Sequence, residues 1–257
     1  RGLTIFILLN LYLYFEEGIN FYKNYFKVGY SGLIGGIGLG TAMISFIYSI
    51  TNTSAAITLL CLAAMPFFTA LLAFLFLREQ ITTNVWVSIF IATIGIVIMA
   101  IGNDEKNSVV GFIFGILSSI GFSVFSVSLR WRKETPKFTT VAVAGLFCFV
   151  FATIMILIKK QVFFSTSYNS ALFSLHGVLV CFGLILYSIG SKMIPAAELT
   201  LLSLTEVIGG IFWVWLPILG INEIPDTNTI IGGFFLFISL FYYSLIMRWN
   251  KRYIGLN

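Results

Sequence analysis

The chain has 257 residues, of which 59% are hydrophobic and only 10% are charged, and its formal net charge is +5. A soluble domain has about half apolar and a quarter charged residues, so this chain has too few charges to cover a soluble globule. The composition excludes a cytosolic enzyme, a nucleic-acid-binding protein and a secreted disulfide scaffold, and it predicts an integral membrane protein.

Nine apolar stretches are candidates to cross a membrane, which takes about 20 residues of helix. They are continuous rather than alternating, which favours helices over barrel strands. We therefore expect an all-α polytopic helical bundle with short connections. In chain order the predicted spans are Leu3–Phe15, Val28–Ile50, Thr53–Leu77, Thr83–Gly102, Val109–Leu129, Phe138–Ile158, Ala171–Gly190, Pro195–Leu219 and Thr229–Met247.

The distribution of lysine and arginine predicts the orientation. If the basic tail 248–257 is cytoplasmic, eleven of the 15 basic residues lie on the cytoplasmic side. This bias is the one expected of a multi-pass protein with a cytoplasmic C-terminus. We expect the protein in a bacterial inner membrane.

Three motifs recur in the same order, which indicates an internal repeat. The matched spans are five helices apart, so the two copies would lie in the membrane with opposite orientations, as in many secondary transporters. We expect a first repeat over 1–102 and a second over 109–247. The first repeat has one helix fewer, so an initial helix equivalent to Val109–Leu129 is expected to be missing and the intact protein to have ten. The matched pairs are Tyr48-Ser49-Ile50 with Tyr187-Ser188-Ile189, Ser54-Ala55-Ala56 with Pro195-Ala196-Ala197, and Glu79 with Thr83-Asn84 against Glu223 with Thr227-Asn228.

The stretch from Ser54 to Glu79 has two small residues, an apolar helix containing Pro66, and a terminal Arg-Glu. It resembles the EamA-type transporters of the drug/metabolite transporter superfamily. The second copy is similar but has Val207 where a proline is usual. The resemblance implies a ten-helix inverted-repeat carrier that moves a small organic solute, such as an amino acid, metabolite or drug-like amine, by alternating access.

Glu206 is the first candidate for a binding site. It lies about 16 Å into its span, close to the membrane midplane, where carboxylates are costly and usually functional. Its helical face carries Ser203, Gly209, Gly210 and Trp213. Glu206 is expected to bind a substrate ammonium or to exchange a proton, and Trp213 to offer its ring face. The alternative is a protonated acid that hydrogen-bonds a neighbouring helix.

Other residues are further candidates for a binding, packing or hinge role. Ser119 and Tyr187 are candidates to line a cavity, and the abundance of aromatic side chains favours an amphipathic organic solute. Glu198 reads as a helix-start carboxylate and His176 as a packing residue. The small-residue seam Gly32, Gly36 and Gly40 predicts close helix packing, and Pro66 and Pro217 are candidate hinges.

No metal or cofactor is expected, because Cys61, Cys148 and Cys181 lie inside apolar runs and phosphate-loop, Rossmann and zinc patterns are absent. The expected partners are the lipid bilayer, a small organic solute and, if transport is coupled, protons. A homodimer is an alternative to a monomer. Two alternatives remain. One is a non-transporting structural or assembly subunit. The other is an intramembrane serine protease that uses Ser31, in Gly29-Tyr30-Ser31-Gly32, with His176.

Overall fold

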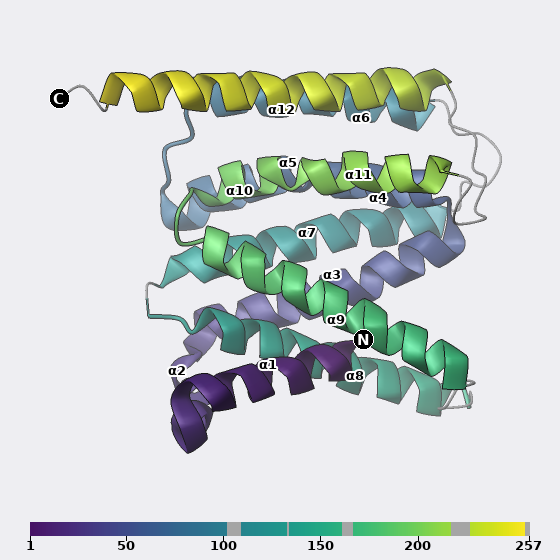
Figure 1. Ribbon diagram of the computed structural model, residues 1–257. Helices are drawn as coiled ribbons and strands as arrows, with labels where there is room; N and C mark the ends of the chain where they lie inside the picture. Colours follow the sequence, from purple (N-terminus) through teal and green to yellow (C-terminus); the bar gives the residue numbers. More distant parts are fainter. Residues whose placement is uncertain (102–108, 133, 161–166, 217–226, 255–257) are drawn as a thin grey trace. The chain divides into compact units, whose positions relative to one another are not determined.

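The computed structural model describes residues 1–101, 109–132, 134–160, 167–216 and 227–254, and all regular structure in these ranges is helical. The prediction of an all-α protein is confirmed (Figure 1). In chain order the elements are α1 (Gly2–Glu17), η1 (Gly18–Tyr22), α2 (Lys23–Lys27), α3 (Gly29–Asn52), α4 (Ala55–Ala63), α5 (Met65–Leu72), η2 (Ala73–Leu77), α6 (Thr83–Ile101), α7 (Val109–Trp131), α8 (Lys137–Ile158), α9 (Ser167–Gly190), α10 (Ala196–Leu202), α11 (Leu204–Trp215) and α12 (Thr227–Ile254).

Six helical stretches of the described residues are long and apolar enough to cross a membrane. Two further apolar stretches, Thr83–Ile98 and Ile230–Ile246, are shorter. The predicted span Pro195–Leu219 is divided instead into α10 and α11. The helices identify a multi-pass membrane protein, while the count of nine spans stays a prediction.

The chain forms two compact units. Unit 1 comprises residues 1–44 and 120–194, and unit 2 comprises residues 45–119 and 195–257. Helices α3 and α7 contribute one end to each unit. Each unit therefore draws on both predicted repeats, whose boundaries stay a prediction about the sequence.

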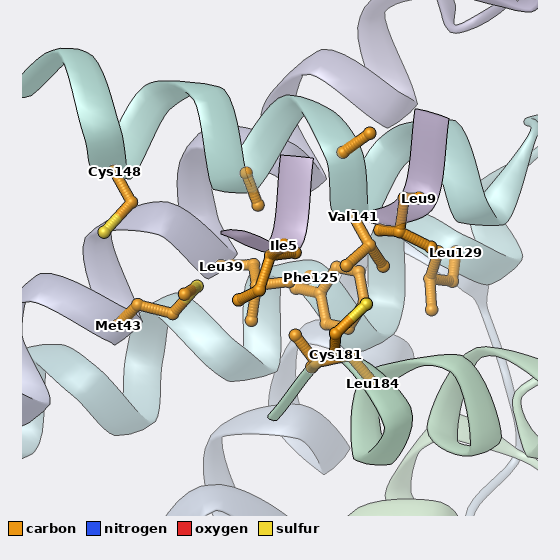
Figure 2. Packing of buried hydrophobic residues seen from close by; sticks show 12 residues of the cluster. Ile5, Leu9, Leu39, Met43, Phe125, Leu129, Val141, Cys148, Cys181 and Leu184 are labelled. Atoms are coloured by element: carbon orange, nitrogen blue, oxygen red, sulfur yellow. The ribbon is translucent and has the colours of Figure 1, made fainter. Parts of the chain in front are cut away.

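The core of unit 1 lies where α1 packs against α8 and α9. Ile5 and Leu9 are fully buried and meet Phe125 and Val141 in one apolar cluster (Figure 2). The α1–α8 contact is close because both helices carry glycine: a Cβ atom added to Gly145 would lie 2.8 Å from the backbone oxygen of Gly2. Glycine thus lets the two backbones approach, as in other membrane helix pairs.

The glycine seam of α3 lies against α8, also in unit 1. A Cβ atom added to Gly36 would come within 2.6 Å of Val143 Cγ1, and one added to Gly40 within 2.6 Å of Phe147 Cδ1. Gly32 lies next to Thr140 on the same side of α8. The seam is therefore a surface of helix packing.

In unit 2, α12 lies along α6 (Figure 1). Ser239 Oγ donates a hydrogen bond of 2.7 Å to the Ser88 carbonyl across this contact. A Cβ atom added to Gly95 would lie 2.6 Å from the Gly232 carbonyl oxygen. The same unit holds four short helices, α4, α5, α10 and α11, in which α5 packs on α10 and α4 packs on α11.

Candidate functional site

The predicted span with the Ser54 to Glu79 motif is interrupted at Ala64. This residue (φ −78°, ψ −8°) separates α4 from α5, and its N–H bonds to the Cys61 carbonyl at 3.1 Å. Pro66 lies in the first turn of α5, where the missing N–H removes no helical hydrogen bond. The helix therefore breaks at Ala64, two residues before the candidate hinge Pro66.

The second copy of this motif breaks at Ser203 without a proline. Ser203 (φ −67°, ψ −10°) separates α10 from α11, and its Oγ donates to the Thr200 carbonyl at 2.7 Å. Thr205 Oγ1 donates to the Leu202 carbonyl at 2.9 Å. Hydroxyl groups that donate to helix carbonyls bend helices. Ser203 and Thr205 therefore favour a bend in this span, as a proline does in other helices.

Glu206 lies directly after this break, in the first turn of α11. Its backbone N–H donates to the Ser203 carbonyl at 2.9 Å. The side chain is exposed and has no hydrogen bond or ion pair with the part of the chain that the structure describes. Carboxylates in membrane spans are rare and nearly always face a bundle interior or a water-filled cavity.

The face of α11 beyond Glu206 has free space beside it. A Cβ atom added to Gly209 would meet no described heavy atom within 4 Å, whereas one added to Gly210 would lie 3.0 Å from Leu59 Cδ1 of α4. Trp213 is 56% exposed and lies seven residues, about 10 Å along the helix, from Glu206. A carboxylate, an open glycine and an indole ring thus follow one another along α11.

Glu198, on α10, differs from Glu206 because it accepts a hydrogen bond from another helix. It is half-buried, and Tyr243 Oη of α12 donates to its Oε2 at 2.6 Å. This hydrogen bond between α10 and α12 gives Glu198 a structural role in unit 2. Sequence reasoning missed the pairing because the two residues are 45 positions apart and no motif links them.

Ser119 and Tyr187 are both engaged in packing contacts. Ser119 Oγ donates to the Cys61 carbonyl, and a Cβ atom added to Gly115, one turn earlier on α7, would lie 2.7 Å from Cys61 Sγ. Tyr187 Oη donates to Ser126 Oγ at 2.8 Å, and its ring stacks on Phe125. Tyr187 belongs to unit 1, whereas Ser119, Ser203, Glu206 and Trp213 belong to unit 2.

The remaining candidates are placed as follows. Ser31 is buried and shares a hydrogen bond of 2.5 Å with Thr135 Oγ1, while His176 is exposed on α9. This geometry gives no support to a serine–histidine pair. Pro217 lies outside the described residues. Among the residues described, no cluster of histidine, cysteine or acidic side chains has the geometry of a metal site.

Comparison with known proteins finds one matching family and two similar transporters. Residues 1–101 match the profile of the EamA-like transporter family. Two relatives from Helicobacter pylori, strains J99 and 26695, are both named "Uncharacterized transporter" and are 30% and 29% identical over 137 residues. The matches cover 52% of this chain and 45% of each relative, so the chain spans about half the length of the curated relatives it matches.

A solved structure described as "Crystal structure of protein" matches 96% of this chain and 96% of its own, with a TM-score of 0.60 and 14% sequence identity. This likeness concerns the fold. Residues 1–101 match the EamA-like transporter family, which confirms the predicted resemblance, and the names of the two relatives support a transporter role.

Proposed function

We propose that this protein is a secondary carrier that moves a small organic amine or amino acid across the membrane by alternating access. The observation that carries the proposal is Glu206: an exposed carboxylate without a partner among the described residues, directly after a helix break, in a chain with an EamA-like segment. Interrupted spans are where carriers bind their substrates, because unwound backbone there can contact a ligand.

The solute binds along α11. Its ammonium pairs with Glu206, its body fills the space beside Gly209, and an aromatic or cationic part lies on the Trp213 ring. A carboxylate that loses its partner when the solute leaves can take up a proton instead. This exchange couples solute movement to the proton gradient, and the C-terminus faces the cytoplasm.

The packing of unit 2 supports an inverted repeat. In the predicted repeat, α4 and α5 correspond to α10 and α11, and α6 corresponds to α12. A two-fold relation between the copies exchanges the α5–α10 contact with the α4–α11 contact, and it pairs α6 with α12. All three contacts occur in unit 2.

The test starts with thermal stabilisation of the purified protein by a panel of amino acids, amines, nucleosides and organic acids at acidic and alkaline pH. A ligand that binds the folded state must raise its apparent stability. Uptake of the best ligand is then measured in proteoliposomes with and without an imposed pH gradient. Glu206→Gln is expected to lower ligand affinity by about tenfold or more, since a charged hydrogen bond is lost, and to remove the pH dependence of uptake.

Glu198→Gln is the matched control, because it changes a carboxylate of the same predicted span whose partner Tyr243 can still donate to the amide oxygen. This variant should bind and transport as the wild type does. Unchanged, pH-dependent transport in Glu206→Gln would contradict the role of Glu206. If no solute stabilises or crosses in the wild type, the protein is a structural or assembly subunit instead.

A further inference from the structure

A polar cavity of about 370 Å³ lies within unit 1. Its walls come from the end of α1, Asn24 of α2, the start of α8 with the residues before it, and the end of α9 with Lys192 after it. The cavity is separate from the α11 face, since that face belongs to unit 2. The basic residues around it place this end on the cytoplasmic side in the orientation predicted from the sequence.

Lys137, the first residue of α8, is the central cation of this cavity. It is only 8% exposed, and its Nζ donates to Ser191 Oγ at 3.1 Å. Arg130 binds the same residue, donating from Nη1 to the Ser191 carbonyl at 3.1 Å. Lys137 forms no ion pair with any described residue. A buried ammonium without a counter-ion is costly, so an anion that entered the cavity would be stabilised.

Two hydroxyl groups in the cavity wall have no hydrogen-bond partner among the described residues. They belong to Thr139 and Ser188, and both side chains are fully buried. Unpaired buried hydroxyls are unusual, since most find a partner in the protein or a bound molecule. Both can donate to an oxygen anion.

The rim of the cavity carries charges of both signs. Glu16, Glu17 and Glu134 are exposed there, together with Lys192. Of these carboxylates, Glu17 accepts a hydrogen bond of 2.7 Å from Asn24. The acidic side chains oppose a ligand that is purely anionic and favour one that also carries an ammonium group. The cavity thus combines a buried cation with outer carboxylates, which is the complement of a zwitterion.

We propose that this cavity binds a phosphoethanolamine group, with the phosphate on Lys137, Thr139 and Ser188 and the ammonium on Glu16 and Glu134. A phosphate suits the wall better than a carboxylate does, because it presents more oxygens to the several donors. Pockets between helices that present cationic side chains at the cytoplasmic end of a membrane protein are places where lipid headgroups bind. The group is presented either by phosphatidylethanolamine of the bilayer or by a free phosphoethanolamine solute.

The experiment measures lipid retained by the purified protein in native mass spectrometry after exchange into equal amounts of phosphatidylethanolamine and phosphatidylglycerol. The wild type should retain phosphatidylethanolamine preferentially. Lys137→Gln should lower its affinity by about tenfold, the loss of one charged hydrogen bond. Lys159→Gln, which removes an exposed lysine at the other end of α8, is the matched control and should bind as the wild type does.

A second variant covers the case in which Lys137→Gln does not fold. The double substitution Thr139→Val with Ser188→Ala removes two unpaired hydroxyls, so it should leave the unfolding temperature unchanged or raise it while lowering lipid affinity. Glu16→Gln with Glu134→Gln should abolish the preference over phosphatidylglycerol. Displacement of the lipid by free O-phosphoethanolamine identifies the solute as a source of the group, and retention of the lipid identifies the bilayer.

The proposal is overturned if the wild type retains phosphatidylglycerol as readily as phosphatidylethanolamine. It is also overturned if the folded Lys137→Gln protein and the double hydroxyl variant both bind phosphatidylethanolamine as tightly as the wild type. These readouts measure binding in unit 1 and need no transport, so they do not depend on the outcome for Glu206.

Discussion

The two broken spans of unit 2 share a backbone design and differ in chemistry. In each, a short helix ends inside an apolar stretch and a second helix follows after one residue, Ala64 or Ser203. The first pair, α4 and α5, has no charged residue and has Pro66 after its break. The second pair has hydroxyl groups at the break and carries Glu198 and Glu206. An interruption of this kind therefore does not require proline, and only one of the two spans carries carboxylates.

The surroundings of the two spans differ as well. Cys61 of α4 is covered by α7, which approaches through Gly115. Gly209 of α11 has open space beside it. The first span is thus packed against α7 at Cys61, whereas the second has no described atom within 4 Å of a Cβ atom added to Gly209.

The largest expected effect is a loss of stability where α7 packs against α4. Gly115→Leu would force a side chain into Cys61, whose Cβ and Sγ already lie 2.7 Å from an added Cβ atom. Overpacking against a helix should lower the free energy of unfolding by about 3 kcal/mol. Thermal unfolding followed by tryptophan fluorescence measures this loss. Gly209→Leu, at the open position, is the control, and equal losses in both variants would erase the contrast between the spans.

The next effect concerns the carboxylate that is held in place. Tyr243→Phe removes the donor to Glu198, whose Oε2 accepts at 2.6 Å. A hydrogen bond to a charged group contributes about 1.5–3 kcal/mol, so we expect a loss in that range. The unfolding temperature provides the measurement. Tyr242→Phe, the neighbouring position on α12, is the control, and a similar loss there would show that the Glu198 bond adds nothing.

A smaller effect is expected at the break without proline. Ser203→Ala removes the hydroxyl that bonds to the Thr200 carbonyl, so regular helical hydrogen bonds should extend across the break. Amide hydrogen exchange in residues 200–207 should become slower, with a change in stability within about 1 kcal/mol. Ser244→Ala removes the same kind of bond from the middle of α12 and should change little. Faster exchange in Ser203→Ala would mean that the hydroxyl stabilises the helix instead.

The smallest expected effect is a gain in stability from a substitution at Gly209. Gly209→Ala adds a methyl group that meets no described atom within 4 Å and improves helix propensity. The protein should gain up to about 1 kcal/mol, measured by thermal unfolding. A clear loss of stability would show that this face is covered, and the proposed binding face would then be wrong.

Much of the fold follows from the sequence because membrane spans are long and uniform. Continuous apolar runs predicted the helices, and the motif from Ser54 to Glu79 predicted the family. The glycine seam of α3 was expected to pack, and it lies on α8. The division of Pro195–Leu219 was missed, because the signal used for kinks was proline and the break at Ser203 has none.

The candidate site was predictable only in part. Glu206 stood out because a charge in an apolar span is rare, and its first-turn position and exposure come from the structure. Tyr187 and Ser119 were chosen as residues that can line a cavity, and both have hydrogen-bond partners in the structure. Lys137 was counted only as a basic residue near the membrane surface, since nothing in a single sequence tells a buried lysine from an exposed one.

The sequence by itself determined the membrane environment, the helical class and the family segment, because hydrophobicity and motif spacing are local properties that need no knowledge of neighbours. The tertiary structure alone decided which polar groups have partners. It joins Tyr243 to Glu198, leaves Glu206 exposed, and buries Lys137 in a cavity wall with two hydroxyls that have no partner among the described residues. Burial and hydrogen bonding depend on residues far apart in the chain, so they arise only when the helices pack.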